Sequence, residues 1–151
     1  MKSVLTVCIG NICRSPMAEG LLTAKLPNIH ISSAGTGALV GRPADTQAQK
    51  LMLQHGIDIS RHVARQVNKL ICSQADLILV MDVEQRRYLE ATYPMVRGKV
   101  FRIAEAAKTD VPDPYREGED AFRYAFDLIE MGARTWIDRI LKITEREQQI
   151  T

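Results

Sequence analysis

The chain has 151 residues, of which 46% are hydrophobic and 25% are charged, with a formal net charge of +2. This length and composition suit one soluble globular domain, and so small a net charge gives no reason to expect a nucleic-acid partner. No apolar run approaches the roughly 18 residues of a membrane span, the N-terminus is too polar for a signal peptide, and the three cysteines form no disulfide scaffold, so we expect a cytoplasmic protein without stable membrane association.

Apolar runs rich in β-branched residues alternate along the chain with longer helical patterns. Strands are expected over residues 3–8, 28–33, 75–81 and 99–103. Helices are expected over residues 16–26, 46–55, 83–93 and 119–145, the last from an apolar stripe at three- and four-residue steps. Strands separated by helices pair in parallel through right-handed crossovers. We therefore expect residues 1–151 to form a single α/β domain, a four-stranded parallel sheet flanked by helices on both faces.

Ligands of open parallel sheets bind beyond the C-terminal ends of the strands. The loops that reach this edge are residues 9–15, residues 34–45 and the segment from Asp82 onward. Residues 109–118, which contain two prolines and two aspartates, are expected to be a fourth loop at the same edge.

The first of these loops has the clearest pattern of a catalytic site. Its sequence is Cys8-Ile-Gly-Asn-Ile-Cys-Arg14-Ser15. Gly10 and Asn11 permit positive φ, and the loop opens into a helix, so its backbone N–H groups can form an anion cradle. Arg14 adds a planar fork that suits two phosphate oxygens. The same positive surroundings would favour a thiolate at Cys8, as a phosphoryl-transfer nucleophile requires. The alternative is a buried structural cysteine beside a surface arginine.

Transfer of a phosphoryl group from an aryl ester is helped by a general acid, because a tyrosyl leaving group has a pKa near 10. Asp110 and Asp113 are the candidates on the last loop. In Asp113-Pro114-Tyr115 the proline stiffens the chain behind the carboxylate, and the tyrosine could flank an aromatic substrate. The alternative is that Asp113 only begins a turn before Pro114.

Together, Cys8-Ile-Gly-Asn-Ile-Cys13-Arg14-Ser15 and Asp113-Pro114-Tyr115 resemble the low-molecular-weight protein tyrosine phosphatases. The resemblance extends over nearly the whole chain and implies the Rossmann-like fold of that family. It implies that Cys8 forms a phosphocysteine and that Arg14 binds the phosphate. It also implies that Asp113 protonates the tyrosyl oxygen and later takes a proton from water.

The same resemblance assigns roles around the loop. Ser15 would stabilise the Cys8 thiolate, and Asn11 would hold the loop in a left-handed turn through hydrogen bonds to Ser33 and His62. Without the resemblance, His62 is an ordinary surface or capping histidine. The residues expected to surround the substrate are Ile9, Gly10, Asn11, Ile12, Cys13, Ser15, Leu39 and Tyr115. No metal or other cofactor is implied, and no Cys-x-x-Cys or His-x-x-His spacing occurs.

Two positions depart from the eukaryotic pattern of the family. Leu39 stands where those enzymes have an aromatic residue, and Arg116 follows Tyr115 where they have a second tyrosine. The rim is then less aromatic and more basic, which is similar to the bacterial enzymes paired with membrane tyrosine autokinases of exopolysaccharide export. We therefore expect a monomer that acts on a phosphotyrosine protein of that kind, and a basic rim would suit acidic phosphopeptides.

The other two cysteines are expected to differ in role. Cys13 either forms a reversible disulfide with Cys8, as the resemblance implies, or packs beneath the loop. Cys72 is expected to be core or to lie near a helix end. Two rival functions use a similar loop. A thioredoxin-coupled arsenate reductase needs two further cysteines close together, and a cysteine phosphocarrier needs a phosphocysteine that persists.

Overall fold

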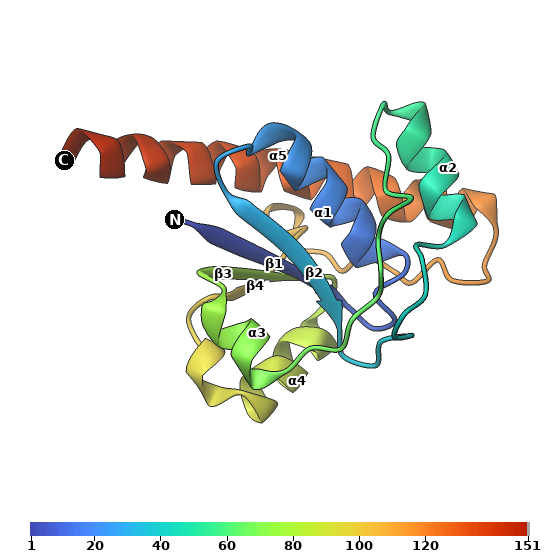
Figure 1. The fold of residues 1–151 in the computed structure, drawn as a ribbon, viewed down its shortest axis with the longest axis horizontal. Coiled ribbons are helices and arrows are strands. Elements are labelled where there is room, and N and C mark those ends of the chain that lie inside the picture. The colour runs from blue at the N-terminus through green and yellow to red at the C-terminus, as the bar shows by residue number, and fades with distance from the viewer. Residues whose placement is uncertain (151) are drawn as a thin grey trace.

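The computed structural model describes residues 1–150, which form one four-stranded parallel sheet between two layers of helices (Figure 1). The strands are β1 (Ser3–Cys8), β2 (His30–Gly35), β3 (Leu77–Val80) and β4 (Val100–Arg102), in the order β2-β1-β3-β4. Val4 in the centre of the sheet is in register with Ile31 on one side and Leu77 on the other. The fold class expected from the sequence is confirmed.

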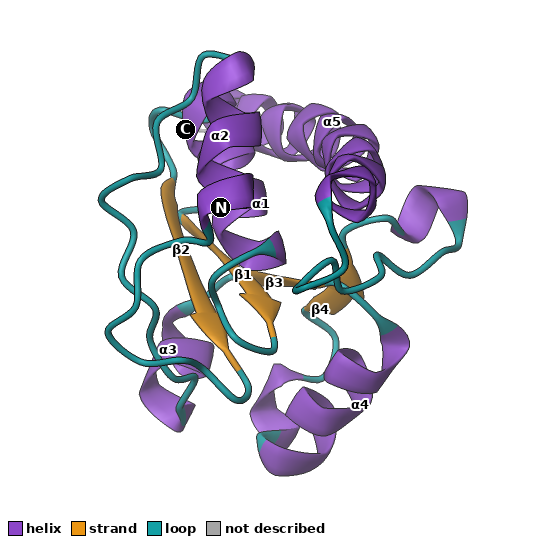
Figure 2. Ribbon diagram, turned by 90° about the vertical axis from the view of Figure 1, so that its right-hand side faces the viewer, coloured by secondary structure: helices purple, strands orange, loops and turns teal. Residues whose placement is uncertain are grey.

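The helices are divided between the two faces of this sheet (Figure 2). On one face lie α1 (Arg14–Lys25), α2 (Thr46–Gln54) and α5 (Glu119–Ile150). On the other face lie α3 (Lys69–Gln74) and α4 (Val83–Thr92), and two short 3₁₀ helices, η1 (Pro94–Val96) and η2 (Glu105–Ala107), border β4. Within residues 1–150, none of the helices is long and apolar enough to cross a bilayer.

Alternate residues of the central strands fill two separate cores. Val4 and Leu79 are buried in the core under α1 and α5, whereas Leu5 and Ile78 are buried in the core under α3 and α4. A strand with apolar side chains on both faces must be covered on both faces, which explains the continuous apolar runs. Two layers of helices therefore hold the sheet rigidly at its centre.

The observed elements differ from the expected ones mainly at their ends. The helix expected from residue 16 begins at Arg14, so Pro16 is its third residue, where an N–H would still lack an intrahelical acceptor. α5 continues past residue 145 to Ile150, and the N-terminal amine of Met1 donates to Glu147 Oε2 at 2.6 Å. The extension places the chain's first residue against its last helix.

The short helix α3 was not expected. It has six residues and only one buried side chain, Cys72, so it shows no helical periodicity in the sequence. Its N-terminus is stabilised by Asn68, whose side-chain oxygen accepts from the N–H of Ile71 at 2.8 Å. The cap is a local feature, whereas the burial of the Cys72 thiol depends on the tertiary structure. Cys72 thus lies in the core, as expected.

Candidate active site

The loop after β1 is held against the chain that leaves β2. The carbonyl oxygens of Cys8, Ile9 and Gly10 accept hydrogen bonds from three backbone N–H groups, those of Thr36, Gly37 and Leu39, all at 3.0 Å. A Cβ at Gly35 would overlap the carbonyl oxygen of Ile9, so only glycine permits this approach. The two strand ends thus form one rigid edge, and Leu39 comes to lie against Gly10.

Asn11 lies at the turn of this loop, and its side chain makes three hydrogen bonds. It has φ of 59°, whereas Gly10, also expected to permit positive φ, has no such φ. Its amide Nδ2 donates to Ser15 Oγ at 2.8 Å and Ser33 Oγ at 3.0 Å, and its Oδ1 accepts from the Arg65 N–H at 2.9 Å. Because both amide hydrogens and the amide oxygen have a partner, the loop is fixed to α1, to β2 and to the chain at Arg65.

His62 supports Asn11 from outside the loop. Its Nε2 lies 2.6 Å from the carbonyl oxygen of Asn11, and since a carbonyl only accepts, Nε2 must carry the hydrogen. Its other nitrogen faces the carboxylate of Glu19, with Nδ1 and Oε2 3.9 Å apart. Burial raises the pKa of the Glu19 carboxyl, and the neighbouring imidazole opposes that rise. Glu19 was not expected from the sequence, because nothing in its spacing relates it to His62.

The Cys8 sulfur is surrounded by hydrogen-bond donors. Ser15 Oγ lies 2.9 Å from it and the N–H of Asn11 donates to it at 3.3 Å. Ser15 Oγ also accepts from Asn11 Nδ2, and its own hydroxyl hydrogen can donate to the sulfur when Cys8 is a thiolate. Helix α1 begins at this point without a side-chain cap. Within residues 1–150, no protein acceptor is found for the backbone N–H groups of Gly10, Ile12, Cys13, Arg14 and Ser15.

Arg14 is buried, and its guanidinium contacts residues of two other loops. Nη1 donates to the carbonyl oxygen of Val111 at 2.9 Å and lies 3.5 Å from Asp82 Oδ2, while Nη2 lies 3.7 Å from Asp113 Oδ2. The loops after β3 and β4 thus position the cation beside the cysteine. The contacts with Asp82 and Val111 were not expected, because the two residues belong to loops far from Arg14 in the sequence.

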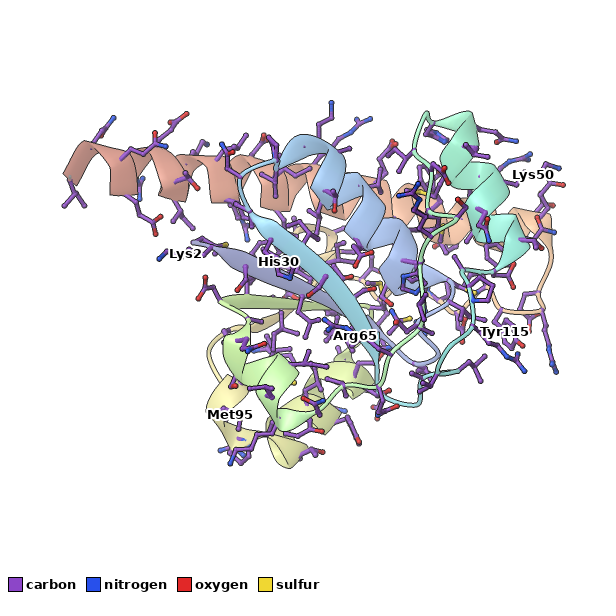
Figure 3. All side chains as sticks on the ribbon, in the orientation of Figure 1. Lys2, His30, Lys50, Arg65, Met95 and Tyr115 are labelled. Atoms are coloured by element: carbon purple, nitrogen blue, oxygen red, sulfur yellow. The ribbon has the colours of Figure 1, made fainter. Side chains whose placement is uncertain are left out.

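These residues enclose a cavity of about 180 Å³ with Cys8 and Arg14 among its lining residues. Its walls are largely apolar and include Leu39 and Tyr115, and Asp113 lies at its edge with its carboxylate half exposed. Tyr115 lies toward the end of the molecule at which the strands finish, opposite Lys2 (Figure 3). The full lining is Cys8, Ile9, Gly10, Ile12, Cys13, Arg14, Gly37, Leu39, Asp113 and Tyr115.

Two of the expected substrate-contacting residues, Asn11 and Ser15, are not in this lining. Both are completely buried behind it and act through hydrogen bonds to the loop and to Cys8. Gly37 is in the lining but was not expected, and its Cα lies beside Ile9 because of the backbone pairing between the two segments.

Cys13 and Cys72 differ in their relation to the cavity. Cys13 lines it but is buried, and both it and Cys8 are free thiols in this structure. Burial raises the pKa of the Cys13 thiol, so it stays protonated at neutral pH and is a slow attacking group. Cys72 lies in the core on the opposite face of the sheet from Cys8, so no cysteine relay of the arsenate-reductase type connects them.

One apolar cavity is thus lined by a cysteine, a buried arginine and a carboxylate. This combination of groups suits the hydrolysis of a phosphate ester. The sequence profile described as "Low molecular weight phosphotyrosine protein phosphatase" matches residues 3–148. The chain belongs to this family. It is therefore a protein tyrosine phosphatase, as the resemblance in the sequence implied.

Individual members of the family match this phosphatase over almost their full length. The probable low molecular weight protein-tyrosine-phosphatase EpsP of Ralstonia nicotianae is 49% identical over 140 residues, which cover 93% of this chain and 97% of EpsP. Wzb of Vibrio vulnificus, solved in complex with benzylphosphonate, superposes with a TM-score of 0.88 at 38% identity, covering 91% of this chain and 98% of Wzb. Escherichia coli K30 Wzb in complex with sulphate gives a TM-score of 0.89 at 34% identity, covering 92% and 98%.

Proposed function

We propose that this single-domain phosphatase acts as a monomer and hydrolyses phosphotyrosine in proteins through a phosphocysteine on Cys8. The observation that carries the proposal is the Ser15 hydroxyl 2.9 Å from the Cys8 sulfur, in a loop whose free N–H groups and Arg14 surround the same cavity. The apolar walls suit an aromatic ring, and the related Wzb of Vibrio vulnificus was solved with benzylphosphonate, an aromatic phosphonate.

In the first step the Cys8 thiolate attacks phosphorus, and the bond between phosphorus and the tyrosyl oxygen breaks. The developing negative charge on the phosphoryl oxygens is met by the loop N–H groups and by the guanidinium of Arg14. The Asp113 carboxyl, which lines the same cavity, gives its proton to the leaving oxygen and releases neutral tyrosine.

In the second step water attacks phosphorus and the bond between sulfur and phosphorus breaks. The Asp113 carboxylate, deprotonated by the first step, takes a proton from the water and returns to its starting state. The Cys8 thiolate leaves with the support of the Ser15 hydroxyl and the Asn11 N–H. Inorganic phosphate is the second product, and a phosphocysteine that persists, as a carrier would need, does not accumulate.

The substrate proposed is the tyrosine-phosphorylated tail of a bacterial membrane autokinase involved in exopolysaccharide export. Its support is the rim, where Leu39 replaces an aromatic side chain and the Arg116 guanidinium lies 5.0 Å above the Tyr115 ring. Because kinases use ATP, such a tail is phosphorylated in the cytoplasm, where we propose that the phosphatase acts. Incubation with an autophosphorylated kinase should release phosphate, and the kinase should lose its phosphotyrosine signal.

Replacement of the nucleophile tests the chemistry directly. The Cys8→Ser variant should bind phosphotyrosine peptides but hydrolyse none, because a serine hydroxyl in this site has no comparable tendency to ionise. Cys72→Ala is the matched control, since that thiol lies on the other face of the sheet, and it should keep its turnover. Hydrolysis by Cys8→Ser at the rate of the unchanged protein would contradict the nucleophile assignment.

Replacement of the general acid should affect substrates unequally. Asp113→Asn should lower kcat for phosphotyrosine about 10²-fold or more, because the tyrosyl oxygen must then leave without a proton. An aryl phosphate with a much more acidic leaving group should lose far less. Equal losses on the two substrates would mean that Asp113 only positions Arg14, to which it lies close.

A further inference from the structure

A second cavity, of about 500 Å³, opens directly beside the active-site cavity. The two cavities share Ile9, Arg14 and Asp113 as lining residues, so a peptide with its phosphotyrosine in one extends naturally into the other. We call the second cavity the side groove. It lies between the loop after β3, the 110–113 segment and Tyr124 of α5.

The side groove combines apolar walls with carboxylates. Ile9 and Tyr124 are both exposed, at 47% and 59%. Asp82, Glu84 and Asp110 also line the groove. An apolar stem that ends in a cation matches this combination, because the stem contacts the walls while the charge stays near the carboxylates and the aromatic ring.

The cations near Asp82 and Glu84 do not fully cancel the charge of these two carboxylates when substrate is bound. Asp82 lies 3.5 Å from Arg14, but that guanidinium must then also balance a phosphate dianion. Asp110 pairs with Arg102 at 3.0 Å, and Glu84 pairs with Arg87 at 3.2 Å through two largely exposed side chains. An exposed pair of this kind is weak, so Glu84 remains able to attract another cation.

We propose that the side groove binds a lysine or arginine side chain of the substrate, within two residues of the phosphotyrosine. Two residues of extended chain span about 7 Å, which suits cavities that share three lining residues. The mouth of the site then has two parts of opposite charge. The side groove is acidic, and Arg116, which lies over Tyr115, is outside the groove. The rim, which the sequence leads us to expect to be more basic at Arg116, then also has an acidic part in the side groove.

This proposal rests on the phosphotyrosine hydrolysis proposed above, and peptide kinetics separate the two. Phosphotyrosine peptides that differ only in having lysine, arginine, glutamine or glutamate at the flanking positions are compared by kcat/KM. Basic peptides should exceed the glutamine peptides by roughly three- to tenfold, mainly through KM, and the advantage should decrease at high salt.

Two variants locate the effect in the groove. Glu84→Gln and Tyr124→Leu should each reduce the preference for basic peptides while leaving turnover of the glutamine peptide unchanged. Their matched controls, Glu117→Gln and Tyr88→Leu, change the same chemical groups at positions that line neither cavity, and should keep the full preference.

The outcomes are distinct. If no peptide is dephosphorylated, the proposed function fails and this proposal fails with it. If all peptides are dephosphorylated equally, if the glutamate peptides are preferred, or if the preference survives in both groove variants, phosphotyrosine hydrolysis stands and the side groove is not a substrate site.

Discussion

The completely buried side chain of Asn11 offers the most demanding test of the site's architecture. Its amide makes three hydrogen bonds, to Ser15, Ser33 and the backbone of Arg65, at 2.8 to 3.0 Å. A buried hydrogen bond contributes about 1 kcal/mol net, so Asn11→Ala removes about 3 kcal/mol. Alanine at φ of 59° adds about 1 kcal/mol of backbone strain. The expected loss of unfolding free energy is therefore about 4 kcal/mol.

The loss can be measured by urea denaturation, with Trp136 as the probe. It is the only tryptophan and is buried, with its Nε1 donating to the Ile103 carbonyl oxygen at 3.0 Å. Asn28→Ala, at an exposed asparagine, is the control and should change stability by less than about 0.5 kcal/mol.

A double-mutant cycle with Ser33→Ala isolates one bond of the network. Because Ser33 accepts from Asn11, the double variant should lose about 1 kcal/mol less than the sum of the single losses. kcat/KM of Asn11→Ala should fall about 10²-fold, since the Ser15 hydrogen is no longer directed at Cys8 and the loop donors are no longer fixed. A loss below 1 kcal/mol, or no coupling in the cycle, would refute this account of the loop.

Two further predictions concern the backbone at either end of the sheet. Gly35→Ala should abolish most activity, because its Cβ would overlap the Ile9 carbonyl oxygen, whereas Gly37→Ala meets only a methyl group 3.6 Å away and should stay active; equal activities would contradict the steric argument. Asp76 accepts from the N–H groups of Lys2 and Ser3, which lowers its pKa. Its stabilisation is thus present above the unfolded pKa and lost as pH falls through the folded value. Asp76→Asn should cost less than about 1 kcal/mol of unfolding free energy at pH 7, and this deficit should vanish in acid.

The elements with strong local patterns could be predicted from the sequence. The apolar runs around Val4 and Leu79 predict buried strands because both faces need cover, and the long stripe of α5 predicts a helix because every third or fourth side chain is apolar. α3 could not be predicted, since it has only six residues and one buried side chain, Cys72, and so shows no apolar periodicity. Local sequence carries little information about such short elements.

The candidate site shows the same division. The Cys8–Arg14 loop could be predicted because it is built from consecutive residues. Asp113 could be singled out because the resemblance implies it as the general acid. The sequence could not predict the contact of Glu19 with His62 or that of Asp82 with Arg14. The partners are far apart in the chain and meet only in the folded structure.

The sequence by itself determined the parallel α/β class, the cradle after the first strand and the family, because each depends on local pattern or on consecutive residues. Only the tertiary structure decided which carboxylates surround the buried arginine, that Cys72 lies across the sheet from Cys8, and that the mouth of the site has an acidic side groove. Each of these features depends on residues that are far apart in the sequence. They come together because the sheet order β2-β1-β3-β4 brings the loops after the strands to a common edge.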